Sequence, residues 1–169
     1  MPDDKPSAVS RIRTSLIGAA LLLAFDAVIS GSFLLSMLVC PFWFLVSLAK
    51  NIIRRSGWRV TLARIAIPAL TLALVLGNAA VQSRIARANA DRIIKACEQF
   101  TAANGGYPTN LDELLPRYLR SVPRAKYSVA FGDFSYWSLE GRHGLMWIAV
   151  PPFGRRIYRF EHRKWGSLD

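Results

Sequence analysis

The fold of this protein is decided by residues 84–108, which read RIARANADRIIKACEQFTAANGGYP. No Gly or Pro occurs in this stretch before Gly105, and its apolar residues recur with the period of an α-helix. These residues are Ala90, Ile93, Ile94, Cys97 and Phe100. Asn104-Gly105-Gly106 follows, and such residues tolerate the left-handed conformation that ends helices. The stretch therefore predicts a long amphipathic helix that buries one face and ends near Gly105.

The chain before this helix is strongly apolar. From Leu16 to Ala49, 34 residues contain a single charge, Asp26. As one helix they would be ~51 Å long, which exceeds the ~30 Å hydrocarbon core of a bilayer. Because Ser30-Gly31-Ser32 can form a polar turn near the middle, we expect a helical hairpin, followed by a third apolar helix. The expected spans are 14–29, 33–49 and 65–81; one tilted helix in place of the hairpin, giving two spans, is the alternative.

The basic residues beside these tracts predict the topology. One cluster precedes the first tract and a larger one fills the connector before the last, and both favour the cytoplasm. They comprise Arg11 and Arg13, and Lys50, Arg54, Arg55, Arg59 and Arg64. With three spans both clusters lie in the cytoplasm, whereas with two spans one of them would have to cross. In either case we expect residues 1–83 to form a membrane region and residues 84–169 to form an extracytoplasmic domain.

Composition agrees with this division. Of the 169 residues, 52% are hydrophobic and 20% are charged, and the formal net charge is +11. Residues 1–83 contribute +5 of it, from 8 basic and 3 acidic residues, and residues 84–169 contribute +6, from 14 basic and 8 acidic residues. These values exclude a single soluble globule and a disordered tail protein.

Residues 107–169 indicate an α+β domain built on the amphipathic helix. Asn110 and Glu113 form a capping pair that opens a one-turn helix, which Pro116 stops. After it, runs with a period of two are separated by turns that contain Gly. The runs are Tyr127–Phe131, Phe134–Glu140, Leu145–Val150 and Arg156–Phe160. We therefore expect a four-stranded antiparallel meander with one face packed on the long helix.

This order of elements resembles type II secretion pseudopilins and type IV pilin-like proteins. The likeness is carried by Ala90–Phe100, the turn Gly105-Gly106-Tyr107-Pro108 after Asn104, Leu111–Leu115, Tyr118-Leu119 and Val122-Pro123. It implies a pilin-like α+β domain on the periplasmic side of a bacterial inner membrane. Those families also carry a Gly-Phe cleavage site and a glutamate early in the membrane helix, but no Glu precedes Glu98 here. The resemblance is therefore extended to the fold and not to filament assembly.

The sequence offers few residues for catalysis or metal binding. Cys97 could pair with His143 or His162 as a nucleophile and a base, but it keeps the period of the buried helix face. Two histidines without a cysteine cluster do not predict a zinc site. We expect no catalytic residues, no metal and no cofactor.

Two polar features remain as candidate sites. Asp26 is costly in lipid and is by default a functional candidate, although it can also lie near the interface or face another helix while protonated. The second feature is a basic cluster interleaved with Tyr158, Phe160 and Trp165. The candidate ligand-binding residues are Arg155, Arg156, Arg159 and Arg163. Such a surface can bind a nucleic-acid strand or anionic lipid headgroups, or it can be a solvated sheet edge.

These features predict a non-enzymatic, multi-pass inner-membrane protein. Its periplasmic domain would contact a protein or another component of the envelope. The alternative is a membrane-tethered module that binds an anionic ligand through the basic cluster. The expected partners are membrane lipids and an envelope or secretion-system protein rather than nucleic acid.

Overall fold

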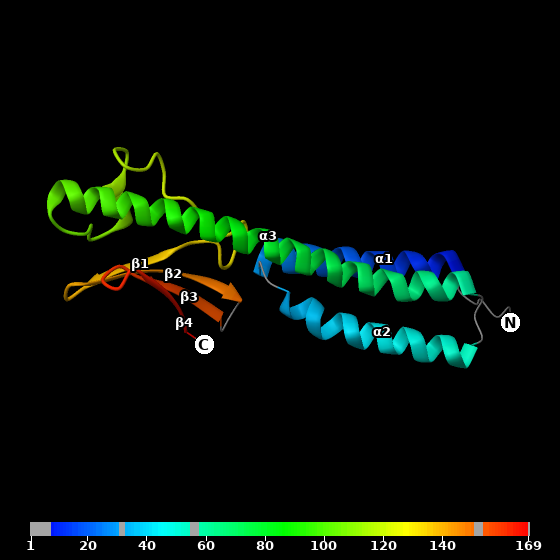
Figure 1. Ribbon diagram of the computed structural model, residues 1–169. Coiled ribbons are helices and arrows are strands. Elements are labelled where there is room, and N and C mark those ends of the chain that lie inside the picture. Colours follow the sequence, from blue (N-terminus) through cyan, green and yellow to red (C-terminus); the bar gives the residue numbers. More distant parts are fainter. Residues whose placement is uncertain (1–7, 31–32, 55–57, 151–153, 169) are drawn as a thin grey trace. The chain divides into compact units, whose positions relative to one another are not determined.

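The structure is a computed structural model that describes residues 8–30, 33–54, 58–150 and 154–168. The chain divides into two compact units, Met1–Ala79 and Ala80–Asp169, close to the boundary expected between residues 83 and 84. The long helix α3 (Trp58–Asn104) contributes to both units (Figure 1). Each unit is described by itself below.

The first unit is helical. Helix α1 (Ala8–Ala24) continues into a π-helical segment, η1 (Phe25–Ser30), and α2 (Leu34–Arg54) follows it. Gly18 of α1 faces α2, since a Cβ atom placed on it would lie 3.8 Å from the ring of Trp43, an ordinary van der Waals contact. The two helices overlap the predicted spans 14–29 and 33–49, and Gly31 and Ser32 of the predicted turn lie outside the described residues.

One helix in the described part of the chain is long and apolar enough to cross a membrane, the section Ile65–Asn104 of α3. The apolar section Leu35–Ala49 is shorter. Because α3 begins at Trp58, Pro68 lies inside the helix. The hydroxyl of Thr71, one turn later, donates to the carbonyl of Ile67 at 2.8 Å.

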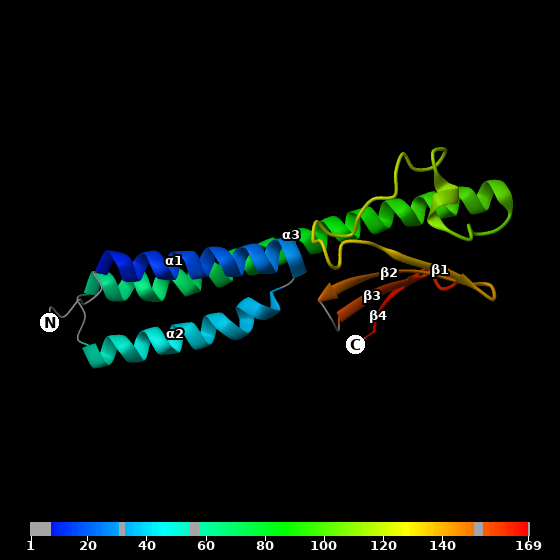
Figure 2. The same cartoon turned by 180° about the vertical axis from the view of Figure 1, so that it is seen from behind.

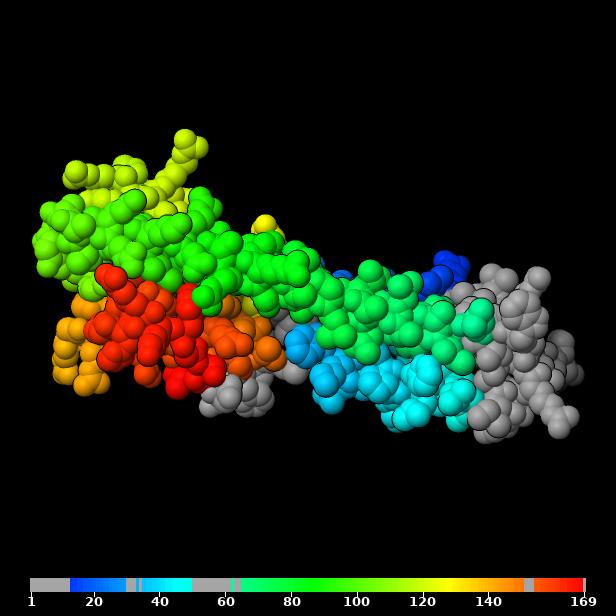
Figure 3. Space-filling model, viewed as in Figure 1, coloured from blue at the N-terminus to red at the C-terminus, as the bar shows by residue number. Residues whose placement is uncertain are grey.

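In the second unit α3 supplies the helix on which the other elements pack. Its buried positions follow the predicted apolar face and extend it towards the N-terminus. They are Ala86, Ala90, Ile93, Ile94, Ala96 and Cys97. Most are small, so neighbouring backbones can come close. The sheet lies along one side of this section, and the chain that joins α3 to the sheet lies along another (Figures 1 and 2). In the space-filling view the C-terminal residues, in red, lie beside the helix, in green (Figure 3).

The predicted helix end and capping pair are confirmed. Helix α3 stops at Asn104, and Gly105 takes a φ of +79°, with its N–H donating to Thr101 O at 2.8 Å. The side-chain oxygen of Asn110 accepts from the N–H groups of Asp112 and Glu113, at 2.9 and 3.2 Å, and so opens the 3-10 helix η2 (Leu111–Leu114).

The sheet is an antiparallel meander of four strands in the order β1-β2-β3-β4. The strands are β1 (Ser135–Leu139), β2 (Arg142–Val150), β3 (Gly154–Arg159) and β4 (Lys164–Leu168). Leu145 of β2 pairs with Tyr136 on one side and Tyr158 on the other, and Tyr158 pairs in turn with Trp165 of β4. Because directly paired residues share a face, this row forms the side of the sheet packed on α3.

The strand prediction was wrong at both ends of the sheet. Residues 127–131 form a loop rather than a strand. The N–H groups of Ala125 and Lys126 both donate to the carbonyl of Gly132, and these hydrogen bonds join the two ends of the loop. Tyr127 and Val129 are each 72% exposed, so the alternation in this segment does not mark a buried face. The fourth strand, β4, was missed because its sequence Lys-Trp-Gly-Ser-Leu has little β-propensity of its own, and its pairing with β3 defines it.

Replacing Gly144 with Ala should destabilise the sheet by about 1–3 kcal/mol. Gly144 pairs with Trp137, and a Cβ atom at this position would overlap the indole ring, which must then move. Gly106→Ala is the control, because nothing lies within 4 Å of the added atom there. Thermal unfolding of the full chain in detergent measures the effect, and equal midpoints for the two variants would contradict the observed packing of Trp137.

Candidate functional site

The face of the sheet turned away from α3 combines apolar and basic side chains, and we call it the outer sheet face. Strand alternation places on it the residues that do not pair within the Leu145 row. Its apolar members are Trp137, Met146, Ile148 and Ile157, and its basic members are Arg142, Arg155, Arg159 and Lys164. None of these basic side chains forms a salt bridge with an Asp or Glu of the described residues. The face is therefore a positively charged surface with an apolar centre.

The four arginines predicted to bind a ligand are not all brought together. Arg155 and Arg159 lie on the outer sheet face, whereas Arg156 pairs with Trp147 and so lies on the side facing α3. Arg163 lies in the turn between β3 and β4, with a φ of +49°. Consecutive strand residues point to opposite faces, so a basic run in sequence cannot form one surface patch. Lys164 takes the place beside Arg159 with which it pairs.

A hollow of about 290 Å³ lies over strands β3 and β4. Ile157 is buried among its lining residues, and Arg159, His162 and Lys164 supply polar groups. Gly166 pairs with Ile157 and has no side chain to fill the space. The hollow therefore joins an apolar floor to basic side chains, which suits a ligand that carries both an apolar part and a negative charge.

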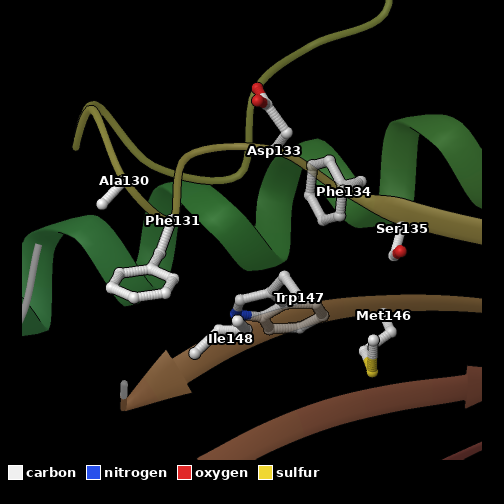
Figure 4. Close-up of a pocket in the computed structure, with 8 residues that line it drawn as sticks. All are labelled: Ala130, Phe131, Asp133, Phe134, Ser135, Met146, Trp147 and Ile148. Atoms are coloured by element: carbon white, nitrogen blue, oxygen red, sulfur yellow. The ribbon is translucent and has the colours of Figure 1, made fainter. Parts of the chain in front are cut away.

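A second hollow, of about 210 Å³, lies between the loop before β1 and the middle of β2. Figure 4 shows Phe131, Phe134 and Trp147 around it, with the indole nitrogen directed toward Phe131 and Ile148. The N–H of Trp147 is buried and has no hydrogen-bond partner among the described residues. Phe134 packs edge-on against Trp147, with ring centroids 5.9 Å apart. The hollow is mainly aromatic and offers one unused donor.

The predicted motif Gly105-Gly106-Tyr107-Pro108 ties the end of α3 to the sheet. The ring of Tyr107 lies 4.8 Å from His143 and 5.1 Å from Phe160, measured between centroids. The hydroxyl of Tyr136 donates to the carbonyl of Pro108 at 2.7 Å, and burial raises the pKa of this hydroxyl. These contacts assign the motif a structural role.

Asp26 also makes a contact that explains its position. It is fully buried, and its Oδ2 accepts a hydrogen bond of 2.8 Å from the backbone N–H of Ser36. Ser36 lies in the first turn of α2, where N–H groups lack partners within the helix. A carboxylate is favoured at this end of a helix. Of the two interpretations of Asp26, the contact supports the one in which it faces another helix.

Two groups with chemically reactive side chains are buried in the second unit. Cys97 is fully buried, and burial raises the pKa of its thiol to about 12, so the nucleophilic thiolate is disfavoured. Lys126 is 2% exposed, and its ammonium group donates to the carbonyl of Ala149 at 2.6 Å. Burial lowers the pKa of Lys126 to about 8. Lys126 gave no signal in the sequence: it lies just before the segment 127–131 that was expected to be a strand, and its partner Ala149 is 23 residues away.

Within the described ranges, no group of three or more His, Cys, Asp or Glu side chains is placed to hold a metal ion. His143 has one acidic neighbour, since its Nδ1 lies 3.1 Å from Oε1 of Glu161. This pair links the turn after β3 to the start of β2, because the backbone N–H of His143 also donates to Glu161. The outer sheet face therefore offers binding through charge and apolar contact.

Lys126 should make stability depend on pH between about 8 and 10.5. Its pKa is lower in the folded state, so the unfolded chain binds more protons in this range and stability rises with pH. Relative to Lys126→Met, the wild type should gain at most about 3 kcal/mol across the range. Chemical denaturation at a series of pH values measures the free energy of unfolding of both proteins. The difference between the two proteins cancels the effect of tyrosine ionisation, which they share. Parallel curves would show that Lys126 titrates normally.

Neither a protein-family model, a curated protein nor a solved structure matches this chain. The resemblance to pilin-like proteins therefore stays a prediction that depends on the residues quoted for it. What the structure itself gives is an α+β architecture, with a long apolar helix followed by a four-stranded antiparallel sheet.

Proposed function

We propose that this chain is a non-enzymatic bacterial inner-membrane protein that presents a small pilin-like domain to the periplasm. There the domain would contact another protein or a component of the envelope. The observation that carries the proposal is the distribution of polar and apolar side chains in the first unit, which is the reverse of that in a water-soluble domain.

Polar side chains lie inside the first unit and large apolar ones lie outside. Its buried polar residues are Asp26, Ser36, Ser47 and Thr71. The exposed apolar residues include Leu16, Leu21, Leu38, Phe42, Leu45 and Leu70. In water such a surface would drive aggregation, whereas in a bilayer it faces lipid tails and the polar groups avoid them. The arrangement supports a multi-pass membrane region built from the predicted spans.

The continuity of α3 supports the placing of the domain. The apolar tract 65–81 and the core positions from Ala86 onward belong to one helix without a break. A domain that shares its first helix with a membrane span is tethered to that membrane. The basic residues before α3 favour the cytoplasm, so the domain at its other end is expected in the periplasm.

The outer sheet face is the surface that we assign to contact with a partner. Trp137, Met146 and Ile148 are only partly covered by the domain, whereas Ile157 is buried. The arginines of this face, which form no salt bridge with a described residue, favour an acidic surface. No catalytic arrangement is needed for this role.

The side of the membrane on which the domain lies can be tested with an impermeant thiol reagent. Val129→Cys should label in intact spheroplasts, because Val129 is 72% exposed and belongs to the domain. Ser56→Cys, in the basic connector, should label only after the membrane is opened. The native Cys40 and Cys97 are buried and give a low background. If Val129→Cys labels only in opened membranes, the domain is cytoplasmic and the proposal is wrong.

A second candidate function is the binding of anionic lipid headgroups through the outer sheet face. It is favoured by the position of Arg155, Arg159 and Lys164 on one face. At ~1 kcal/mol for each basic residue near an anionic membrane, Arg155→Gln should weaken binding to phosphatidylglycerol vesicles about fivefold.

Arg156→Gln is the matched control for this candidate, because it removes the same charge from the other side of the sheet. The full chain, reconstituted in neutral nanodiscs, would be titrated with the vesicles at low and at physiological salt. Binding through exposed charges should weaken as salt rises. Equal losses for Arg155→Gln and Arg156→Gln would exclude the outer sheet face as the binding surface.

A further inference from the structure

A third hollow, of about 300 Å³, lies on another side of α3, away from the outer sheet face. Arg92, Lys95 and Gln99 line it from the helix, with spacings of three and four residues that place them on one face. The other wall is the segment Tyr118–Arg120. We call this site the basic hollow. Its volume is at the lower end of the range of small-molecule sites.

The wall formed by residues 118–120 is held in place by several contacts. The backbone N–H groups of Tyr118 and Leu119 both donate to the carbonyl of Leu114, at 2.9 and 3.0 Å. The ring of Tyr118 packs edge-on against Phe100, with centroids 5.7 Å apart. Loop and helix are thus fixed relative to each other before any ligand binds, which lowers the cost of binding.

Polar groups of the basic hollow lack partners within the protein. Among the described residues, no carboxylate forms a salt bridge with Arg92, Lys95 or Arg120. The hydroxyl of Tyr118 is buried and has no hydrogen-bond partner in the same part of the chain. A buried hydroxyl without a partner costs free energy, so an arriving acceptor would remove that cost.

Asp91, the acidic residue next to Arg92 in α3, is engaged elsewhere. Asp91 pairs with Arg87 at 3.5 Å, and Arg87 covers the ring of Trp165 on the sheet. The residues that line the basic hollow thus supply three cations, an amide and a hydroxyl, and include no Asp or Glu.

We propose that the basic hollow binds a phosphate-bearing anion, which Arg92, Lys95 and Arg120 neutralise and to which Gln99 and Tyr118 donate hydrogen bonds. A phosphate monoester is favoured over a carboxylate because it carries close to two charges and has three acceptor oxygens. Guanidinium groups can bind such oxygens in pairs. The inference does not depend on which side of the membrane the domain occupies.

The phosphate could belong to a lipid headgroup or to a soluble compound. Arg92 follows Val81 by 11 residues, about 17 Å along the helix axis, whereas a headgroup layer is only ~5–8 Å thick. We therefore expect a soluble phosphate compound to occupy the site.

The test is calorimetric titration of the full chain in phosphatidylcholine nanodiscs with glycerol 3-phosphate and inorganic phosphate at physiological salt. We expect saturable binding that Arg92→Gln with Lys95→Gln weakens about tenfold or more, since two charge-assisted contacts are lost. Tyr118→Phe should weaken binding several-fold without lowering thermal stability, because its hydroxyl bonds nothing in the described protein. Repeating the titration in phosphatidylglycerol nanodiscs distinguishes the sources, since a lipid headgroup in the site would compete with glycerol 3-phosphate.

The matched control is Arg155→Gln with Arg159→Gln, which removes the same charge from the outer sheet face. If the basic hollow is the site, this control pair should change the affinity for the phosphate compounds by no more than about twofold relative to the wild type. The proposal is overturned if the wild type shows no saturable binding in either type of nanodisc, or if the control pair weakens binding as much as the Arg92 and Lys95 pair. These outcomes are separate from the labelling result that tests the proposed function.

Discussion

The second unit depends on one constraint, the burial of the face of α3 between Ala86 and Phe100. Alanines recur along this face, so the sheet and the segment after the helix can approach its backbone closely. Aromatic side chains of the sheet, Tyr158, Phe160 and Trp147, fill the space against these small residues. The helix has little room for larger side chains on this face. The sides of α3 that face neither the sheet nor the segment after the helix are left to polar groups.

The elements that sequence predicted well are those with strong local signals. The apolar period from Ala90 to Phe100, the end at Gly105 and the cap at Asn110 each rest on the chemistry of a few adjacent residues, and the structure confirms them. The strands were less predictable, because pairing with a neighbour decides them. Residues 127–131 alternate as a strand would but close into a loop around Gly132, whereas β4 has weak propensity and is held by β3.

The candidate sites were predictable only in part, for a related reason. The run from Arg155 to Arg163 is basic in sequence, but strand alternation sends Arg156 to the side opposite Arg155. The basic hollow could not be found from sequence, since Arg92 and Arg120 are far apart along the chain and meet only because residues 118–120 fold back on α3. Lys126 escaped notice in the same way, because its carbonyl partner is in β2.

The order of the strands has a consequence for how the domain forms. Each strand of the meander pairs with the one that precedes it in sequence, so no strand must wait for a distant part of the chain before it can join the sheet. Contacts between sequence neighbours form quickly, because only short loops have to close. The helix that supplies the packing surface is also synthesised first. The sheet can therefore grow strand by strand on a finished helix as the chain emerges, with only its newest edge open to mispairing at any moment.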